Sequence, residues 1–120
     1  MTIEQQQIYR GDVYFADLGQ KQSDRDSIQR GKRPVLVVSN NKANKYSQAI
    51  TVVPLTTRNK KHLPTHTEFD LPEKDYFVRN TALCEQVRTI NVDQLYFKID
   101  SVSADVMARI NACLRVALEV

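Results

Sequence analysis

At residues 30–40 the chain reads Arg30-Gly31-Lys32-Arg33-Pro34-Val35-Leu36-Val37-Val38-Ser39-Asn40, a cluster of cations followed directly by an apolar run. Four apolar residues in a row without alternation are typical of a strand that is covered on both faces. Pro34 lacks an N–H and suits the first position of a strand, while Gly31 suits the turn before it. The sequence therefore predicts a buried strand that holds Arg33 on a fixed backbone at the edge of a sheet.

The segment before this strand predicts a hairpin with a long connection. Alternation over residues 9–18 indicates a half-buried strand, with Val13, Phe15 and Leu18 on one face and Asp12 and Tyr14 on the other. Residues 19–32 form a polar loop that is longer than usual, and long loops often have a function.

The rest of the chain predicts short strands and one closing helix. Strands are expected at residues 48–55, 67–70, 81–84 and 86–90, a helical turn at 41–45, and a turn over 71–80. Ser103 suits a helix N-cap, and apolar residues recur after it at helical spacing, at Val106, Ile110, Cys113, Leu114, Ala117 and Leu118. This order predicts a mainly β fold of the α+β class, a small and strongly bent antiparallel sheet or barrel with a C-terminal helix packed against it.

Length and composition limit the class of protein. Residues 1–120 are enough for one domain with a single core. The N-terminal segment lacks the apolar core of a signal peptide, and no apolar run reaches the roughly 18 residues of a membrane span, so we expect a cytoplasmic protein. Cys84 and Cys113 lie apart within apolar patterns, which predicts buried, reduced thiols.

The charges of the chain are unevenly placed. The total is +3, but residues 21–67 hold ten Lys and Arg against two Asp, a net +8 that leaves −5 elsewhere. No acidic residue occurs between Asp26 and Glu68. Because protein surfaces usually intersperse the two signs, this segment indicates a polyanionic partner whose phosphates supply the missing charge. A basic face without a partner is the alternative.

The sequence offers few candidates for a metal site or a catalytic site. His62 and His66 are four apart, but Pro64 between them excludes a shared helix face, so we expect no metal site and assign them phosphate contact or solvent exposure. Arg33 begins one apolar strand and Thr56 ends the next, so antiparallel pairing would bring both to one edge. A fixed guanidinium beside a hydroxyl suits a phosphate that gains charge in its transition state. The alternatives are a surface ion pair for Arg33 and a turn cap for Thr56.

Four segments form a specific set. They are Arg10-Gly11-Asp12-Val13-Tyr14-Phe15-Ala16-Asp17-Leu18, Arg33-Pro34-Val35-Leu36-Val37-Val38-Ser39-Asn40, Val53-Pro54-Leu55-Thr56-Thr57 and Leu83-Cys84-Glu85-Gln86-Val87-Arg88-Thr89-Ile90. In this order the chain resembles the MazF/PemK family of toxin endoribonucleases from type II toxin–antitoxin systems. The resemblance implies an SH3-like barrel, a homodimer and cleavage of single-stranded RNA at a short sequence, without metal or other cofactor. The ribose 2′-OH would attack, leaving a 2′,3′-cyclic phosphate and a 5′-OH.

The resemblance also implies roles for individual residues. Arg33 would stabilise the phosphorane or protonate the leaving 5′-oxygen, and Thr56 would hold the phosphate or the 2′-OH. Glu85 matches an acidic position at the border of the active groove, where it would act as a base or orient Arg33. Gln86 and Arg88 are expected in the groove and its framework. The residues expected to contact RNA are Gln29, Arg30, Lys32, Ser39, Asn40, Tyr46, Thr57, Arg58, Lys60, Lys61 and Gln86.

The loop before Arg33 departs from the family pattern. Members often carry Gly-Ser-Glu-Gln-x-Gly there, whereas this chain has Asp26-Ser27-Ile28-Gln29-Arg30-Gly31 behind a lengthened loop. Ile28 stands in place of the frequent Glu, so any role of that carboxylate as a base is lost. The added cations indicate an altered grip on RNA or an altered choice of sequence, which makes the loop the expected place of specificity.

The family resemblance also implies partners. We expect an antitoxin whose acidic tail lies in the basic groove and excludes RNA. Two other functions remain open at the level of the sequence, since one fold hosts several activities. One is a non-catalytic toxin that binds a protein such as DNA gyrase, and the other is a nucleic-acid-binding barrel without catalysis.

Overall fold

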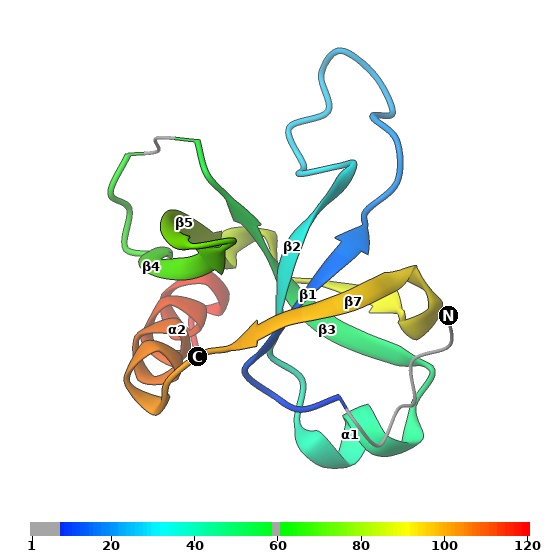
Figure 1. Ribbon diagram of the computed structural model, residues 1–120. Helices are drawn as coiled ribbons and strands as arrows, with labels where there is room; N and C mark the ends of the chain where they lie inside the picture. Colours follow the sequence, from blue (N-terminus) through cyan, green and yellow to red (C-terminus); the bar gives the residue numbers. More distant parts are fainter. Residues whose placement is uncertain (1–7, 59–60) are drawn as a thin grey trace.

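The computed structural model describes residues 8–58 and 61–120 and shows a strongly bent antiparallel sheet with a C-terminal helix packed against it (Figure 1). The strand order is β4-β5-β3-β2-β1-β7, and β6 pairs with β3. The predicted mainly β fold is confirmed. The elements are β1 (Asp12–Asp17), β2 (Lys32–Val37), α1 (Asn41–Tyr46), β3 (Ala49–Thr56), β4 (His66–Glu73), β5 (Tyr76–Leu83), η2 (Cys84–Gln86), β6 (Arg88–Asn91), η3 (Val92–Gln94), β7 (Leu95–Ser101) and α2 (Ala104–Leu118).

Strand β2 has apolar neighbours on both faces, as its continuous apolar run predicts. Val35 and Val37 belong to one buried cluster, and Leu36 belongs to another on the opposite face. All three side chains are fully buried. Because both faces are packed, β2 is held rigidly, and the residues at its beginning have a fixed position.

Strand β3 is where the sheet changes direction. Its first half pairs with β6, its middle pairs with β2, and its last residues, Leu55 and Thr56, pair with Ala82 and Thr81 of β5. The end of β3 therefore lies where the two halves of the bent sheet meet.

Strand β1 is more deeply buried than its alternation suggests. Tyr14 and Leu18 lie in the cluster of Val35, and Val13 lies in the cluster of Leu36. The prediction that Leu18 shares a face with Val13, and that Tyr14 faces outward, is wrong because the bent sheet is covered on both sides. Even Asp12 is buried, where its carboxylate accepts a hydrogen bond from Ser101 at 2.8 Å.

Helix α2 begins where the sequence predicts. The Ser103 hydroxyl accepts a hydrogen bond from the Val106 amide at 3.2 Å, and Ile110 and Cys113 are buried in the cluster of Leu36. Cys113 and Cys84 are both buried and free, as expected. Within the described part of the chain, neither helix combines the length and apolar character that a membrane crossing requires.

In the second half of the chain one prediction is wrong and one strand is missing from the prediction. Residues 71–80 are not a long turn, because β4 and β5 continue as a hairpin to the pair Glu73 and Tyr76. Strand β7 was not predicted, since Tyr96, Phe97 and Lys98 in its middle are all exposed and show no alternation. Both segments lie at edges of the sheet, where burial imposes little pattern on the sequence.

Candidate active site

Arg33 and Thr56 lie at the same end of two neighbouring strands. β2 and β3 are antiparallel, with Val35 opposite Pro54 and Leu36 opposite Val53. The paired residues end at Val35 and Pro54, and the same register extended by two residues would place Arg33 opposite Thr56. Opposite residues of an antiparallel pair point to the same face, so the prediction that the guanidinium and the hydroxyl share one edge of the sheet stays a prediction.

The Thr56 hydroxyl also shapes the chain that follows it. Its Oγ1 accepts a hydrogen bond from the Arg58 amide at 3.2 Å, and the residue is buried. Thr56 thus caps a turn, as the alternative interpretation expected. That bond uses a lone pair of the oxygen, so the O–H hydrogen can still donate to a phosphate oxygen or a ribose hydroxyl.

The long loop holds the guanidinium of Arg33. Nε donates to the carbonyl oxygen of Arg30 at 2.8 Å, and Nη1 donates to the side-chain oxygen of Gln29. The Gln29 amide in turn donates to Oε1 of Gln86 at 2.8 Å. Gln29 and Gln86, both expected to contact RNA, therefore position Arg33 through a connected set of hydrogen bonds.

The surroundings of Arg33 favour an anion. The residue is half-buried, and the ion pairs among the described residues do not include it. Burial lowers the pKa of Arg33 below its ordinary value, and the nearby Arg58 guanidinium lowers it further. The positive charges of Arg33 and Arg58 repel each other, and a phosphate bound between them would offset this repulsion.

Glu85 is paired with His66, for which the sequence analysis expected phosphate contact or solvent exposure. Glu85 lies in η2, and its Oε2 is 3.0 Å from Nε2 of His66. Nδ1 of His66 lies 2.9 Å from the carbonyl oxygen of Lys61. Both ring nitrogens of His66 thus lie within hydrogen-bond distance of an oxygen atom.

The burial of His66 excludes the exposed role that the sequence suggested. Only 6% of its side-chain surface is exposed, against 38% for Glu85. The alternation of Thr67, Phe69 and Leu71, which are buried, marks a strand that begins at His66. That pattern could have assigned His66 to a strand, but nothing in the sequence connects it to a carboxylate 19 residues later.

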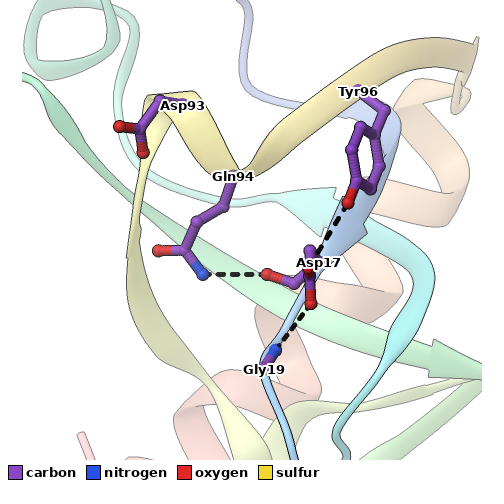
Figure 2. A pocket seen from close by; sticks show the side chains of 5 residues that line it. All are labelled: Asp17, Gly19, Asp93, Gln94 and Tyr96. Atoms are coloured by element: carbon purple, nitrogen blue, oxygen red, sulfur yellow. Dashed lines mark hydrogen bonds between the residues drawn. The ribbon is translucent and has the colours of Figure 1, made fainter.

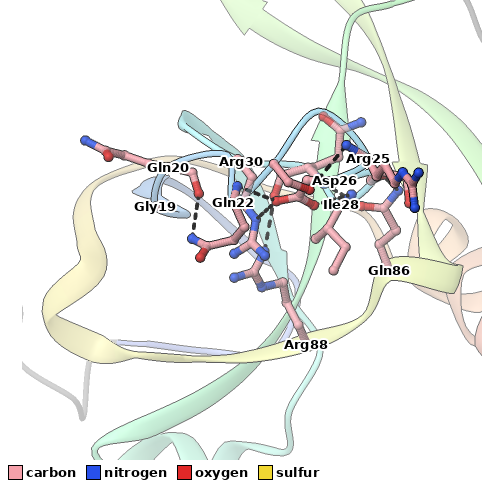
Figure 3. Close-up of polar contacts among 12 residues, drawn as sticks. Gly19, Gln20, Gln22, Arg25, Asp26, Ile28, Arg30, Gln86 and Arg88 are labelled. Atoms are coloured by element: carbon pink, nitrogen blue, oxygen red, sulfur yellow. Dashed lines mark hydrogen bonds and ion pairs between the residues drawn. The ribbon is translucent and has the colours of Figure 1, made fainter.

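The long loop is ordered around one carboxylate. Asp26 accepts hydrogen bonds from the amides of Gln22 and Ile28, each at 3.0 Å, and from Nε of Arg30 at 3.0 Å (Figure 3). These bonds hold the pKa of Asp26 below its ordinary value, the two backbone amides first and Arg30 after them. Arg88 binds the same loop from β6, since its Nη1 donates to the Gln29 carbonyl at 3.1 Å.

A hollow at the root of this loop is unsuited to phosphate. It is lined by Asp17, Gly19, Asp93, Gln94 and Tyr96, and Figure 2 shows the Asp17 carboxylate between Gly19 and Tyr96. Asp17 accepts a hydrogen bond from the Gly19 amide at 2.9 Å and from the Tyr96 hydroxyl at 3.3 Å. Two carboxylates repel an anion, so we assign this hollow to holding the loop.

Three residues expected to contact RNA lie at the opposite end of β2. Ser39 follows the strand, Asn40 caps α1 by accepting a hydrogen bond from Ala43, and Tyr46 ends α1. Figure 1 shows α1 and the long loop at opposite ends of the sheet. Ser39 is also engaged with Asn44, whose side-chain nitrogen donates to its carbonyl oxygen.

The other expected contacts lie near Arg33 or outside the described residues. Thr57, Arg58 and Lys61 are exposed in the segment after β3, and the Lys32 ammonium lies 5.6 Å from the ring centroid of Tyr96. Lys60 falls outside the described residues. Within the described ranges, no three His, Cys, Asp or Glu side chains are grouped as a metal site would require.

Comparisons with known proteins identify the family of this chain. The profile of the family described as the PemK-like, MazF-like toxin of type II toxin–antitoxin systems matches residues 9–118. Endoribonuclease EndoA of Bacillus subtilis is 37% identical over 112 residues, which cover 92% of this chain and 94% of the relative.

Solved structures give the same result. A mycobacterial endoribonuclease in complex with its cognate antitoxin is 28% identical, with a TM-score of 0.73 and coverage of 94% of this chain and 96% of that chain. MazF from Deinococcus radiodurans, 22% identical with a TM-score of 0.73 and coverage of 94% and 97%, shares the fold. The chain belongs to the PemK-like, MazF-like toxin family of type II toxin–antitoxin systems.

Proposed function

We propose that this toxin is a sequence-specific endoribonuclease that cuts single-stranded mRNA and thereby inhibits translation and growth. The name of the Bacillus relative supports the endoribonuclease activity. The observation that carries the proposal is the half-buried Arg33 guanidinium, which is held by Gln29 and Arg30 at the beginning of β2 and lies near the Arg58 guanidinium. Such a site suits the phosphate of a polyanion better than any neutral ligand.

The chemistry we propose uses a nucleophile from the substrate. The ribose 2′-oxygen forms a bond to the adjacent phosphorus while the bond from phosphorus to the 5′-oxygen breaks. The 2′-OH gives up its proton, for which the Glu85 carboxylate is the candidate acceptor, and the leaving 5′-oxygen takes up a proton from Arg33 or from water and departs as a 5′-OH. Arg33 and Thr56 donate to the phosphate oxygens as charge develops. Since the attacking group belongs to the RNA, the protein needs neither its own nucleophile nor a metal-bound water.

We further propose an antitoxin with an acidic C-terminal tail as the partner, and a cytoplasmic homodimer as the working form. A similar solved structure contains an endoribonuclease with its cognate antitoxin, which supports such a partner. The net +8 of residues 21–67 would attract acidic side chains as it attracts phosphates, so tail and RNA would exclude each other.

The direct test is incubation of the purified protein with long single-stranded RNA in EDTA, followed by mapping of cut sites and end groups. We expect cuts at one short motif that leave a 2′,3′-cyclic phosphate and a 5′-OH. An Arg33→Ala preparation, purified in the same way, reports contaminating nucleases. If folded wild-type protein cuts none of several varied RNAs, a non-catalytic toxin that binds a protein such as DNA gyrase, or a barrel that only binds nucleic acid, becomes the better interpretation.

A further inference from the structure

A hollow of about 330 Å³ lies between the long loop and the segment that connects η2 to β6. This volume is within the range of about 300–1,000 Å³ typical of small-molecule pockets. In Figure 3 the Ile28 side chain lies between Gln86 and Arg88. The lining residues are Ile28, Arg30, Glu85, Gln86, Val87 and Arg88.

One wall of this hollow is apolar. Ile28 is 46% exposed, although the loop around it is ordered. Its amide donates to Asp26 at 3.0 Å, which fixes the backbone and keeps the side chain toward the hollow. Val87, which packs against the buried core beneath, adds a second aliphatic side chain. A flat apolar group placed on these two side chains would remove them from water.

The other wall is cationic. Arg30 lies 3.0 Å from Asp26, and Nη1 of Arg88 donates only to the neutral Gln29 carbonyl. Burial and the nearby Arg30 lower the pKa of Arg88, whereas the nearby Asp26 acts in the opposite direction. Asp26 and Glu85, which also lines the hollow, offset part of this positive charge. A ligand that places a flat apolar ring on Ile28 and a negative group near Arg88 complements both walls, and a nucleotide of RNA has both parts.

We propose that this hollow binds the base of one nucleotide close to the scissile phosphate, stacked on Ile28 and Val87, and sets base choice at that position of the cleavage motif. The inference rests on the proposed ribonuclease function. Proximity to the cut follows from two observations. Glu85 lines the hollow, and Gln29, which holds Arg33, is hydrogen-bonded to Gln86 on the same wall. Arg30 and Arg88 bind the phosphate of that nucleotide, while the size of the hollow discriminates between bases.

The test compares cleavage of RNA pools in which each position of the wild-type motif is varied. For Ile28→Ala we expect the ratio of kcat/KM between the preferred base and its best competitor to fall about tenfold at one position, and to stay unchanged at the others. Ile28→Leu keeps an aliphatic surface and should retain the preference. Val116→Ala, which alters an aliphatic residue on α2 that is 55% exposed, is the matched control and should cut as the wild type does.

The possible results separate this inference from the function on which it rests. Unchanged preferences in Ile28→Ala, or equal losses at every position, would overturn the base site and leave the nuclease intact. If the wild-type protein cuts no RNA, the proposed function is wrong, and the proposal of a base site is refuted as well. The Ile28 side chain makes no hydrogen bond, so the backbone bond to Asp26 remains in both variants and loop collapse is not expected.

Discussion

At the scale of single residues, the cation at the candidate catalytic site is fixed in advance of any substrate. Two hydrogen bonds to Arg30 and Gln29 orient the Arg33 guanidinium, and β2 fixes its backbone. Donors that are already oriented toward a developing charge need no reorganisation at the moment of reaction. We therefore assign the guanidinium to stabilisation of the transition state rather than to general affinity.

The Arg33→Ala variant is expected to lose about 10²–10³-fold or more in cleavage rate, because one oriented donor to the developing charge is removed. RNA binding should survive within about tenfold, since one phosphate contact among several is lost. Arg33→Lys should also fail, because an ammonium cannot replace the planar fork held by Gln29. Single-turnover cleavage measures the loss of rate, and binding of an RNA that lacks the reactive 2′-OH measures the loss of affinity.

The control is Arg79→Ala, which removes an arginine paired with Asp70 on the β4–β5 hairpin. Wild-type cutting by Arg33→Ala would refute the assigned site.

His66 is expected to act through Glu85. In His66→Ala the carboxylate loses its partner at 3.0 Å, so kcat should fall about tenfold or more while KM changes little. The loss of the two hydrogen bonds of His66 should lower the free energy of unfolding by about 1–3 kcal/mol, which a denaturant titration measures. A purely structural role would predict independent effects of the two residues. Our assignment instead predicts that His66→Ala adds nothing to the cleavage defect of Glu85→Ala.

At the scale of elements, the long loop behaves as a folded part of the site. Its two ends are joined by hydrogen bonds from the Gly31 amide to the Gly19 carbonyl at 2.7 Å and from the Leu18 amide to the Gly31 carbonyl at 2.8 Å. Gly19 and Gly31 both have positive φ, which β-carbon-bearing residues adopt only with strain. Asp26 organises the part between them, and Gln86 and Arg88 attach the loop to the sheet.

Replacement of Asp26 by Ala should release the loop while the sheet remains folded. The amides of Gln22 and Ile28 and the Arg30 side chain all lose the same acceptor. We expect faster tryptic cleavage at Arg25 and Arg30, a melting temperature within a few degrees of wild type, and weaker base discrimination by the toxin. Asp24→Ala changes an exposed carboxylate two positions earlier and is the matched control. Equal protease resistance of wild type and Asp26→Ala would contradict this account of the loop.

The same carboxylate makes loop order dependent on pH. The hydrogen bonds lower the pKa of Asp26, so the folded loop binds a proton less readily than the unfolded chain does. Its contribution to loop order is therefore complete above the pKa of an unperturbed Asp, about 3.9, and is lost as the pH falls through the lower pKa of the folded loop. The amide resonances of Gln22 and Ile28 should report a midpoint below about 3.9. A midpoint above that value would mean that the carboxylate does not stabilise the loop.

The sequence predicts those elements whose pattern is imposed by burial or capping. The apolar run of β2 and the Ser103 cap with its apolar spacing determine the strand and helix α2, and both are confirmed. Strand β7 escapes prediction because its central side chains are exposed. The antiparallel order of β2 and β3, which the prediction for Arg33 and Thr56 assumes, is confirmed. The hydrogen bonds from Arg33 to Gln29 and between His66 and Glu85 depend on how a loop and a turn fold. The hydrophobic periodicity of the sequence contains no information about either.

At the scale of the whole molecule, the positive charge of residues 21–67 is divided between two ends of the sheet. Arg33, Arg58 and Lys61 lie at the end that carries the long loop, whereas Lys42 and Lys45 lie in or beside α1 at the other end (Figure 1). The residues hydrogen-bonded to Arg33 and Glu85 lie at the end of the sheet that carries the long loop. We therefore expect RNA at the site to contact Arg58 and Lys61.

Two double variants of equal charge locate the RNA. Arg58→Gln/Lys61→Gln should weaken binding of an RNA without the reactive 2′-OH and make the plot of log affinity against log salt shallower by about 1.4, since two phosphate contacts on a single strand are lost. Lys42→Gln/Lys45→Gln removes the same charge from the α1 end, so a general effect of net charge would weaken both variants equally. Our assignment predicts an unchanged slope for the α1 variant. An equal loss there would instead place RNA along both ends of the sheet, where Ser39, Asn40 and Tyr46 would contact it.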